Sequence, residues 1–207
     1  KEMIGIISYG LGNINAFSNI YKSLDIPSII VNKYEELDNV KKIILPGVGA
    51  FDDAMNKFNE SGLRDPVEKM VLKNNIPLLG VCVGMQILGD SSDEGSQKGL
   101  GWINGKIKLI DTSNISHQTK LPHMGWNSIS IINNNDPLFN NINNGDRFYF
   151  LHSYYFKCKD NKQVIAESKY GIDFSCAVKI NNIYGVQFHP EKSLKNGIKL
   201  LYNFANI

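Results

Sequence analysis

Cysteine is scarce in this chain. Its 207 residues include only Cys82, Cys158 and Cys176, an odd number at wide spacings. A disulfide framework needs several cysteines in pairs, and a structural zinc site needs short cysteine spacings, so neither is expected. We therefore expect free thiols in a reducing cytoplasm, with no metal and no cofactor.

An excess of charge of one sign is also lacking. Lysine and arginine number 22 and aspartate and glutamate 20, which leaves a net charge of +2. The two signs are interspersed along the chain, and no basic stripe with interleaved aromatic residues occurs. We therefore expect no nucleic-acid partner.

Long apolar runs are absent as well. The longest are a few residues, against about 20 for a membrane-spanning helix, and no signal-peptide pattern opens the sequence. Apolar residues make up 43% of the chain, a fraction typical of a globular protein with a substantial core. We expect one domain, residues 1–207, and no membrane association.

Strand-like and helix-like segments alternate in the first half. Helical spacing of apolar residues predicts helices that begin near residues 14, 51 and 66. Short apolar runs predict buried strands between these helices, at residues 3–8, 28–31, 42–45 and 78–81. Such alternation is typical of an α/β fold with a mostly parallel central sheet flanked by helices.

The second half predicts additional, partly antiparallel strands on the same domain. Residues 90–101 are polar and glycine-rich and predict a loop, whereas residues 194–205 predict a closing amphipathic helix. Turn residues separate six strand-like runs, at residues 105–110, 127–132, 147–155, 164–168, 174–180 and 183–188.

Two glycine-rich turns follow predicted strands. In the first, Gly10 and Gly12 are followed by Asn15 where a dinucleotide fingerprint requires glycine, so no such cofactor is expected. The second, PGVG at residues 46–49, lies at the carboxyl end of a strand, where open α/β sheets bind ligands. Its backbone either presents N–H groups to an anion or forms only a tight turn.

The most informative stretch is residues 77–88, PLLGVCVGMQIL. A buried strand turns into a helix there, with Cys82 at the apex and Gly80 and Gly84 two residues to either side. This spacing is typical of a nucleophile elbow, where side chains at the flanking positions would collide. The start of a helix also favours the thiolate form of cysteine. The alternative is a small buried apolar residue in a glycine-rich turn.

A nucleophilic cysteine needs a base, and the base needs a group that orients it. His189 follows an apolar strand and precedes Pro190, which favours an extended backbone. Extended residues two apart face the same way, so Glu191 is expected to accept a hydrogen bond from His189. Taken singly, the two would be a strand-end histidine and a solvated acid.

With these residues placed, the sequence resembles the class I (triad) glutamine amidotransferases. Residues 80–86 (GVCVGMQ) and 187–191 (QFHPE) resemble the two signature segments of that family. The resemblance implies a flavodoxin-like α/β domain of the class I type. Five further segments are similar to the family of glutaminase subunits of imidazole glycerol phosphate synthase: residues 9–13 (YGLGN), 46–51 (PGVGAF), 122–127 (PHMGWN), 147–154 (RFYFLHSY) and 189–193 (HPEKS).

The resemblance implies a Cys82–His189–Glu191 catalytic triad. The Cys82 thiolate would attack the side-chain amide of L-glutamine, His189 would protonate the departing ammonia, and water would hydrolyse the thioester. The oxyanion would be held by backbone N–H groups of Val83 and of the 46–49 turn, at Val48 and Gly49.

The resemblance also implies further site residues. His152 would shape the site without a chemical role, and His117 and His123 have no acidic or cysteine neighbours and are interpreted as structural. Substrate contacts are expected from Gly49, Gln86, Ser153 and Tyr154. The partner interface and the ammonia gate are expected at Tyr149, Lys192 and Asn13.

The family resemblance implies a (β/α)₈-barrel cyclase as the partner in a heterodimer. Ammonia would pass to it and yield imidazole glycerol phosphate and an aminoimidazole ribotide in histidine biosynthesis. Ser8 stands where the family usually carries Asp, in the stretch expected to face the partner. The same glutaminase chemistry could instead feed a surface-sugar amidination synthetase. Alternatives of other classes are an elbow-cysteine hydrolase and a catalytically idle docking protein.

Overall fold

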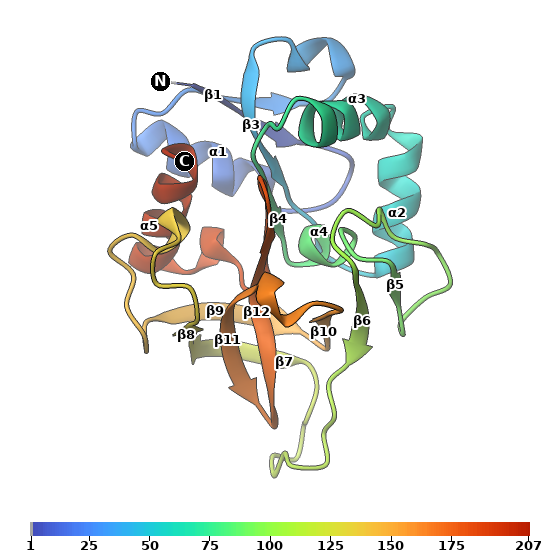
Figure 1. Ribbon diagram of the computed structural model, residues 1–207, viewed down its shortest axis with the longest axis vertical. Coiled ribbons are helices and arrows are strands. Elements are labelled where there is room, and N and C mark those ends of the chain that lie inside the picture. The colour runs from blue at the N-terminus through green and yellow to red at the C-terminus, as the bar shows by residue number, and fades with distance from the viewer. Residues whose placement is uncertain (1) are drawn as a thin grey trace.

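The computed structural model describes residues 2–207 and is organised around an eight-stranded sheet (Figure 1). Five neighbouring strands pair in parallel, and three further strands at one edge of the sheet pair antiparallel. The expected α/β architecture with antiparallel additions is confirmed. In spatial order the strands are β2 (Ser28–Val31), β1 (Met3–Ile7), β3 (Val40–Leu45), β4 (Leu78–Val81), β13 (Ile183–Val186), β12 (Ile172–Ile180), β11 (Val164–Tyr170) and β8 (Ser130–Ile131).

Helices cover both faces of the parallel strands, which is why these strands are mostly apolar. Figure 1 shows α1 (Ile14–Ser23) and α5 (Leu194–Ala205) on one side of the sheet. The other side carries α2 (Phe51–Glu60), α3 (Arg64–Glu68) and the short α4 (Val83–Gln86). The helix expected from residue 66 begins at Arg64 and ends in a π-helical turn, η2 (Lys69–Lys73).

Two small sheets lie beside the main one, and both depart from the sequence prediction. One contains β10 (Tyr154–Cys158), β6 (Gly105–Leu109) and β5 (Ser91–Ser92), and the other β7 (His123–Ser128) and β9 (Arg147–His152). A single strand over 147–155 is therefore wrong, because the chain leaves one sheet and enters another at Ser153. The expected loop 90–101 contains β5. Short 3-10 helices occur at η1 (Tyr34–Leu37), η3 (Pro137–Phe139), η4 (Asn161–Gln163) and η5 (Pro190–Lys192).

Strand β7 has an inverted polarity. Its apolar residues Met124 and Trp126 are 65% and 40% exposed, whereas His123 on its other face is buried. A single strand at 127–132 is therefore wrong, because this stretch joins the end of β7 to β8 of the main sheet. The start of β7 is missed because the inversion hides it from a search for buried apolar alternation. The face that carries Met124 and Trp126 is an apolar surface available to a partner.

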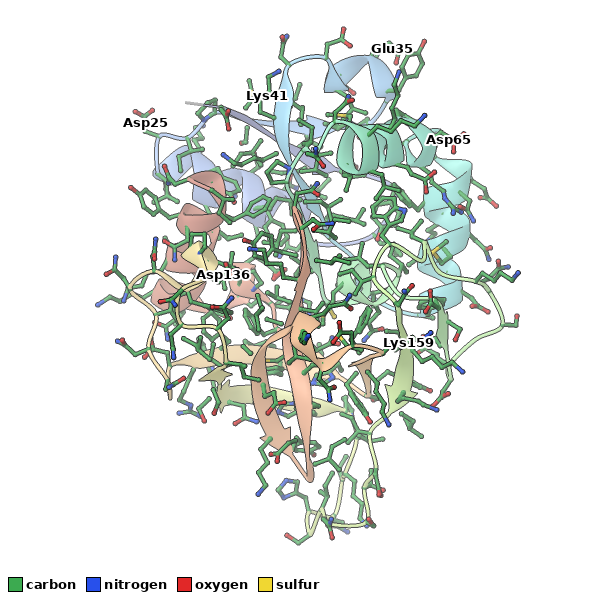
Figure 2. The ribbon with its side chains drawn as sticks, in the orientation of Figure 1. Asp25, Glu35, Lys41, Asp65, Asp136 and Lys159 are labelled. Carbon is green, nitrogen blue, oxygen red and sulfur yellow. The ribbon has the colours of Figure 1, made fainter. Side chains whose placement is uncertain are left out.

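A buried carboxylate ties the antiparallel strands to α5. Asp136, labelled in Figure 2, precedes η3 and accepts hydrogen bonds from Lys179 of β12 at 2.7 Å and from Tyr184 of β13 at 3.1 Å. Because η3 also packs on α5, this contact fixes the strand end of the molecule against its helical layer. No helix among residues 2–207 is long and apolar enough to cross a membrane.

The register of the parallel strands decides where the loops meet. Leu45 at the end of β3 pairs with Gly80 of β4, and Gly80 pairs with Gly185 of β13. The segments that follow these three neighbouring strands therefore emerge at one edge of the sheet. They carry the 46–49 turn, Cys82 and His189, at the place where α/β sheets bind ligands.

Candidate active site

The turn after β4 is a strained elbow. Cys82 has φ 56° and ψ −113°, a conformation that side chains other than glycine rarely adopt. A Cβ at Gly80 would stand 2.6 Å from the carbonyl oxygen of Gly84, and one at Gly84 would stand 2.0 Å from that of Leu45. Backbone atoms cannot yield at such distances, so the expectation that both flanking positions require glycine is confirmed.

The 46–49 turn packs directly against this elbow. A Cβ at Gly47 would lie 2.8 Å from the backbone nitrogen of Gly84 and 2.8 Å from the hydroxyl of Tyr9. The Tyr9 hydroxyl donates a hydrogen bond of 2.6 Å to the carbonyl of Pro46 and so anchors the start of the turn. Its other end is open, since Gly49 has φ 96° and no heavy atom within 4 Å of the position of a Cβ.

His189 and Glu191 are in contact, as expected. The ring nitrogen Nδ1 of His189 lies 3.2 Å from Oε1 of Glu191, and both side chains are 2% exposed. The reason given from the sequence was wrong, however. His189 is extended, but Pro190 opens the 3-10 helix η5, so it is this tight turn that brings the carboxylate back to the ring.

The same ring also faces Cys82. Burial by itself lowers the pKa of His189, but hydrogen bonds to the side chains of Cys82 and Glu191 outweigh it and raise this pKa to about 10. The imidazole is therefore protonated at neutral pH and presents a positive charge to the sulfur. A positively charged neighbour favours the thiolate, which is the reactive form of cysteine.

These groups border a pocket of about 250 Å³. Its walls combine the elbow, the open end of the 46–49 turn and the crossing from β9 to β10. Most of the site residues predicted from the sequence line it, and Glu191 lies behind His189. The lining residues are Val48, Gly49, Cys82, Val83, Gln86, Glu94, Pro122, Leu151, His152, Ser153, Tyr154, His189 and Lys192.

Two of the residues expected at the interface lie outside the pocket. Tyr149 is half-buried, with its ring 6.0 Å from Nζ of Lys192 and 6.2 Å from the ring of Trp126. Asn13 is exposed at the start of α1. Its neighbour Gly12 packs on Pro46, which places this loop beside the 46–49 turn. The roles of Tyr149, Lys192 and Asn13 remain predictions.

Glu94 is a pocket residue that sequence reasoning missed. Its carboxylate accepts a hydrogen bond of 2.6 Å from the backbone nitrogen of Phe51, the first residue of α2. It is the only acidic residue among those that line the pocket. The glycine-rich loop 90–101 contains three acids, and nothing in the sequence singles out Glu94 among them. An ammonium group bound in the pocket would find its counter-charge here.

The histidines His123 and His152 form a buried pair beside the pocket. Nδ1 of His123 lies 2.9 Å from Nε2 of His152, whose own Nδ1 lies 2.8 Å from the carbonyl oxygen of Tyr154. A carbonyl can only accept, so His152 carries its proton on Nδ1 and accepts from His123. Burial lowers the pKa of His123 to about 4 and of His152 to about 3, so both rings are neutral.

Among residues 2–207, no cluster of three or more histidine, cysteine, aspartate or glutamate side chains is placed to hold a metal ion. Cys158 and Cys176 are both free, as expected, and both are buried. Burial raises the pKa of the Cys158 thiol to about 12 and that of Cys176 further still. Neither thiol is therefore a competing nucleophile.

A family model described as "Glutamine amidotransferase class-I" matches residues 6–207. The "Imidazole glycerol phosphate synthase subunit HisH" of Leptospira borgpetersenii is 51% identical over 205 residues, which cover 99% of this chain and 100% of that relative. A protein of the same name from Bdellovibrio bacteriovorus is 49% identical over 205 residues, with the same coverage of both chains.

Solved structures of the same fold are more distant in sequence. A chain of the PurLQS structure from Thermotoga maritima has a TM-score of 0.75 at 19% identity, covering 100% of this chain and 98% of its own. The glutaminase domain of a Trypanosoma brucei CTPS, solved with bound acivicin, has a TM-score of 0.65 at 16% identity, covering 100% and 94%. At these identities the likeness shows the fold alone.

Proposed function

The chain belongs to the class-I glutamine amidotransferases, and from that membership we propose that it is the glutaminase subunit of an imidazole glycerol phosphate synthase. It hydrolyses L-glutamine to glutamate and ammonia, and the ammonia passes to a cyclase subunit in histidine biosynthesis. Relatives named as subunits of that synthase match this chain over the whole of their own length, which supports the assignment. We propose that residues 1–207 form one domain.

Cys82 is the nucleophile. Its sulfur attacks the side-chain amide carbon of glutamine, and the tetrahedral intermediate collapses to a thioester as the C–N bond breaks. His189, protonated in the resting site, delivers the proton that makes the departing nitrogen ammonia. The neutral ring then takes a proton from water, which attacks the thioester, releases glutamate and restores the thiolate beside the protonated ring.

Glu191 holds the ring of His189 in place and stabilises its positive charge. The contact is buried on both sides, so little solvent screens it. A base oriented in this way keeps Nδ1 occupied and directs Nε2 toward the sulfur and the substrate. Glutamine approaches the ring from its pocket side.

The oxyanion is held by backbone N–H groups at Val83, Val48 and Gly49. Val83 is the first residue of α4, where the helix supplies no acceptor for its N–H. Each such donor contributes roughly 3 kcal/mol to lowering the barrier. Gly49 is exposed with open space around it, so the end of the turn is free to rotate. The bound partner favours the orientation that presents the N–H groups.

The glutamine backbone binds to polar groups of the pocket. Gln86, Ser153, Tyr154 and Glu94 are all among the residues that line it. The ammonium group of the amino acid pairs with the Glu94 carboxylate, and the side-chain amide reaches toward Cys82.

The partner is a (β/α)₈-barrel cyclase that docks over the pocket mouth. Trp126, Tyr149 and Lys192 form a continuous path from the exposed face of β7 to the pocket. Val48 and Met124 add exposed apolar area at 39% and 65%. A surface of this kind is buried when a complex forms. Asn13 lies on the loop beside the 46–49 turn and completes the expected interface.

The observation that carries this proposal is the meeting of Cys82 with the His189–Glu191 pair at a pocket. Glutamate release, measured alone and with the cyclase and its aminated sugar-phosphate acceptor, tests it. We expect turnover to rise when both are added and to vanish in Cys82→Ser, whereas Cys158→Ala keeps it. Equal rates with and without the partner would contradict activation by docking. No glutamate under either condition would contradict the glutaminase function.

A further inference from the structure

A second side chain, besides that of His189, contacts the sulfur of Cys82. The amide nitrogen Nε2 of Gln187 lies 3.7 Å from Sγ, a hydrogen-bond distance for a sulfur acceptor. Gln187 is 0% exposed and follows directly after β13, two residues before His189. Its backbone N–H donates to the carbonyl of Cys176 at 2.8 Å, so the residue is fixed at its backbone as well.

The orientation of this amide follows from a chain of hydrogen bonds. Nε2 of Gln86 lies 3.2 Å from the carbonyl oxygen of Tyr154, which can only accept, so the NH₂ group of Gln86 is on that side. The same NH₂ group lies 3.0 Å from Oε1 of Gln187 and donates to it. With its oxygen occupied in this way, Gln187 must turn its own NH₂ group toward Cys82.

The carbonyl oxygen of Tyr154 accepts two hydrogen bonds, one from Gln86 and one from His152. The Nδ1 atom of His152 donates to it at 2.8 Å. Because Gln86 and His152 both line the pocket and both end on this fixed backbone oxygen, neither side chain can flip without losing a buried hydrogen bond. The donor that reaches the sulfur is therefore held in a single orientation.

A donor aimed at sulfur favours the thiolate over the neutral thiol. His189 supplies a positive charge on one side of Sγ, but it gives up a proton during the reaction. Gln187 cannot titrate, so its N–H remains a donor through every step. It also reaches the sulfur from within the protein, since it is not among the residues that line the pocket.

We propose that Gln187 belongs to the catalytic machinery, as a permanent hydrogen-bond donor that stabilises the Cys82 thiolate, with Gln86 as the positioning residue that fixes its orientation. This inference rests on the proposed function for its biological meaning. The contact itself is tested by the ionisation of Cys82, which is measurable without glutamine.

The test is the pH dependence of alkylation of Cys82 by iodoacetamide, followed by mass spectrometry of the peptide that contains it. Gln187→Met keeps the length of the side chain and removes the donor. We expect the midpoint of the alkylation profile to rise by about one pH unit, so that the rate falls roughly tenfold at any pH well below both midpoints. Gln86→Met leaves the donor in place but frees its orientation, and should raise the midpoint by less.

The matched control is Gln163→Met, the same change in a glutamine of η4 whose side-chain oxygen has no hydrogen-bond partner. Its alkylation profile should coincide with that of the unmodified protein. An unshifted midpoint in folded Gln187→Met would overturn the proposal, even if glutaminase turnover fell. A shifted midpoint in a chain that releases no glutamate would leave this contact standing and count against the proposed function instead.

A measurement on the unmodified chain covers the case in which Gln187→Met does not fold. The side-chain amide resonances of Gln187 should move as Cys82 ionises, and should stop titrating once Cys82 is alkylated. Resonances that are insensitive to both treatments would show that the amide does not report on the sulfur, and would exclude the proposed bond.

Discussion

The carboxylate of Glu191 and the ring of His189 form a buried contact of 3.2 Å inside one tight turn. In an ordinary α-helix, side chains two residues apart do not face each other and could not form this contact. Pro190 starts a 3-10 helix at this point, and Ser193, which closes the turn, donates a hydrogen bond of 2.5 Å to the carbonyl of His189. The orientation of the base is therefore determined by the turn and by the acid together.

Replacing Glu191 by glutamine should lower the pKa of His189. The wild-type value of about 10 depends on hydrogen bonds to Cys82 and Glu191, and burial opposes them. Without the negative charge, the alkaline limb of the kcat/KM profile for glutamine should move to lower pH. The loss of one charge-assisted hydrogen bond should reduce kcat roughly 10- to 100-fold. An alkaline limb that stays in place would argue against this pairing.

Replacing Cys82 by glycine should stabilise the chain relative to alanine, although both variants are inactive. The backbone at Cys82 has φ 56° and ψ −113°, which glycine adopts without strain. Relief of that strain, less the greater flexibility of unfolded glycine, predicts about 1 kcal/mol in favour of Cys82→Gly. Urea unfolding of the two variants measures the difference. If alanine proved the more stable, the elbow would not be strained.

Replacing Glu94 by glutamine should raise KM for glutamine and leave kcat nearly unchanged. The amide oxygen can still accept from Phe51, so α2 keeps its cap, while the pocket wall loses its acidic residue. An interaction made equally in the ground state and the transition state appears in KM alone, and we expect roughly a tenfold increase. The control is Asp53→Asn on the first turn of α2, an exposed acid that pairs with Lys57. Equal KM values for Glu94→Gln and wild type would remove Glu94 from substrate binding.

The chain should lose stability as the pH falls below about 6.5. Burial depresses the folded pKa of His152 to about 3, so the unfolded chain binds a proton that the folded chain excludes. The neutral ring thus contributes stability that is present above pH 6.5 and is lost progressively between there and pH 3. Asparagine at position 152 keeps a donor for the Tyr154 carbonyl but does not titrate.

Urea unfolding of wild type and His152→Asn at pH 7 and pH 5 measures this effect. The variant should lose about 2 kcal/mol less in total between pH 7 and pH 5, because the slope of about 1.4 kcal/mol per pH unit is reached only below the unfolded pKa. Parallel pH dependence in the two proteins would mean that His152 takes up a proton as readily in the folded chain as in the unfolded chain. The neighbouring His123 would show the same behaviour to a smaller extent, since its pKa of about 4 lies closer to the ordinary value.

The parallel half of the fold was predictable because its strands are buried on both faces. Residues 3–8, 28–31, 42–45 and 78–81 are short apolar runs between helical patterns, and each lies on an observed strand. The break at Ser153 was not predictable in this way. Residues 147–155 are uniformly strand-like, and what divides them is the pairing of β9 with β7 and of β10 with β6, which the local sequence does not encode.

The site, too, was predictable only in part. Cys82 and His189 follow neighbouring strands and have glycine or proline near them, and this local pattern allowed both to be predicted from the sequence. Glu94 reaches the pocket because its loop is held by Asp52 of α2, which accepts from the backbone nitrogens of Ser96 and Gln97 at 2.9 Å. Contacts between segments 44 residues apart leave no periodic signal, and the contact of Gln187 with the sulfur was hidden for the same reason.

All three cysteines are buried, but only Cys82 borders the pocket, and the pKa values of Cys158 and Cys176 are raised. The native chain should react with one equivalent of a thiol reagent, at Cys82. Two further equivalents, at Cys158 and Cys176, should react only after denaturation. The amount of reagent that the native protein consumes therefore measures the fraction of molecules in a preparation whose Cys82 is reactive. No engineered label is needed. A fluorophore placed on the same sulfur would lie in the pocket, and a change in its emission on adding the cyclase would test the proposed docking surface.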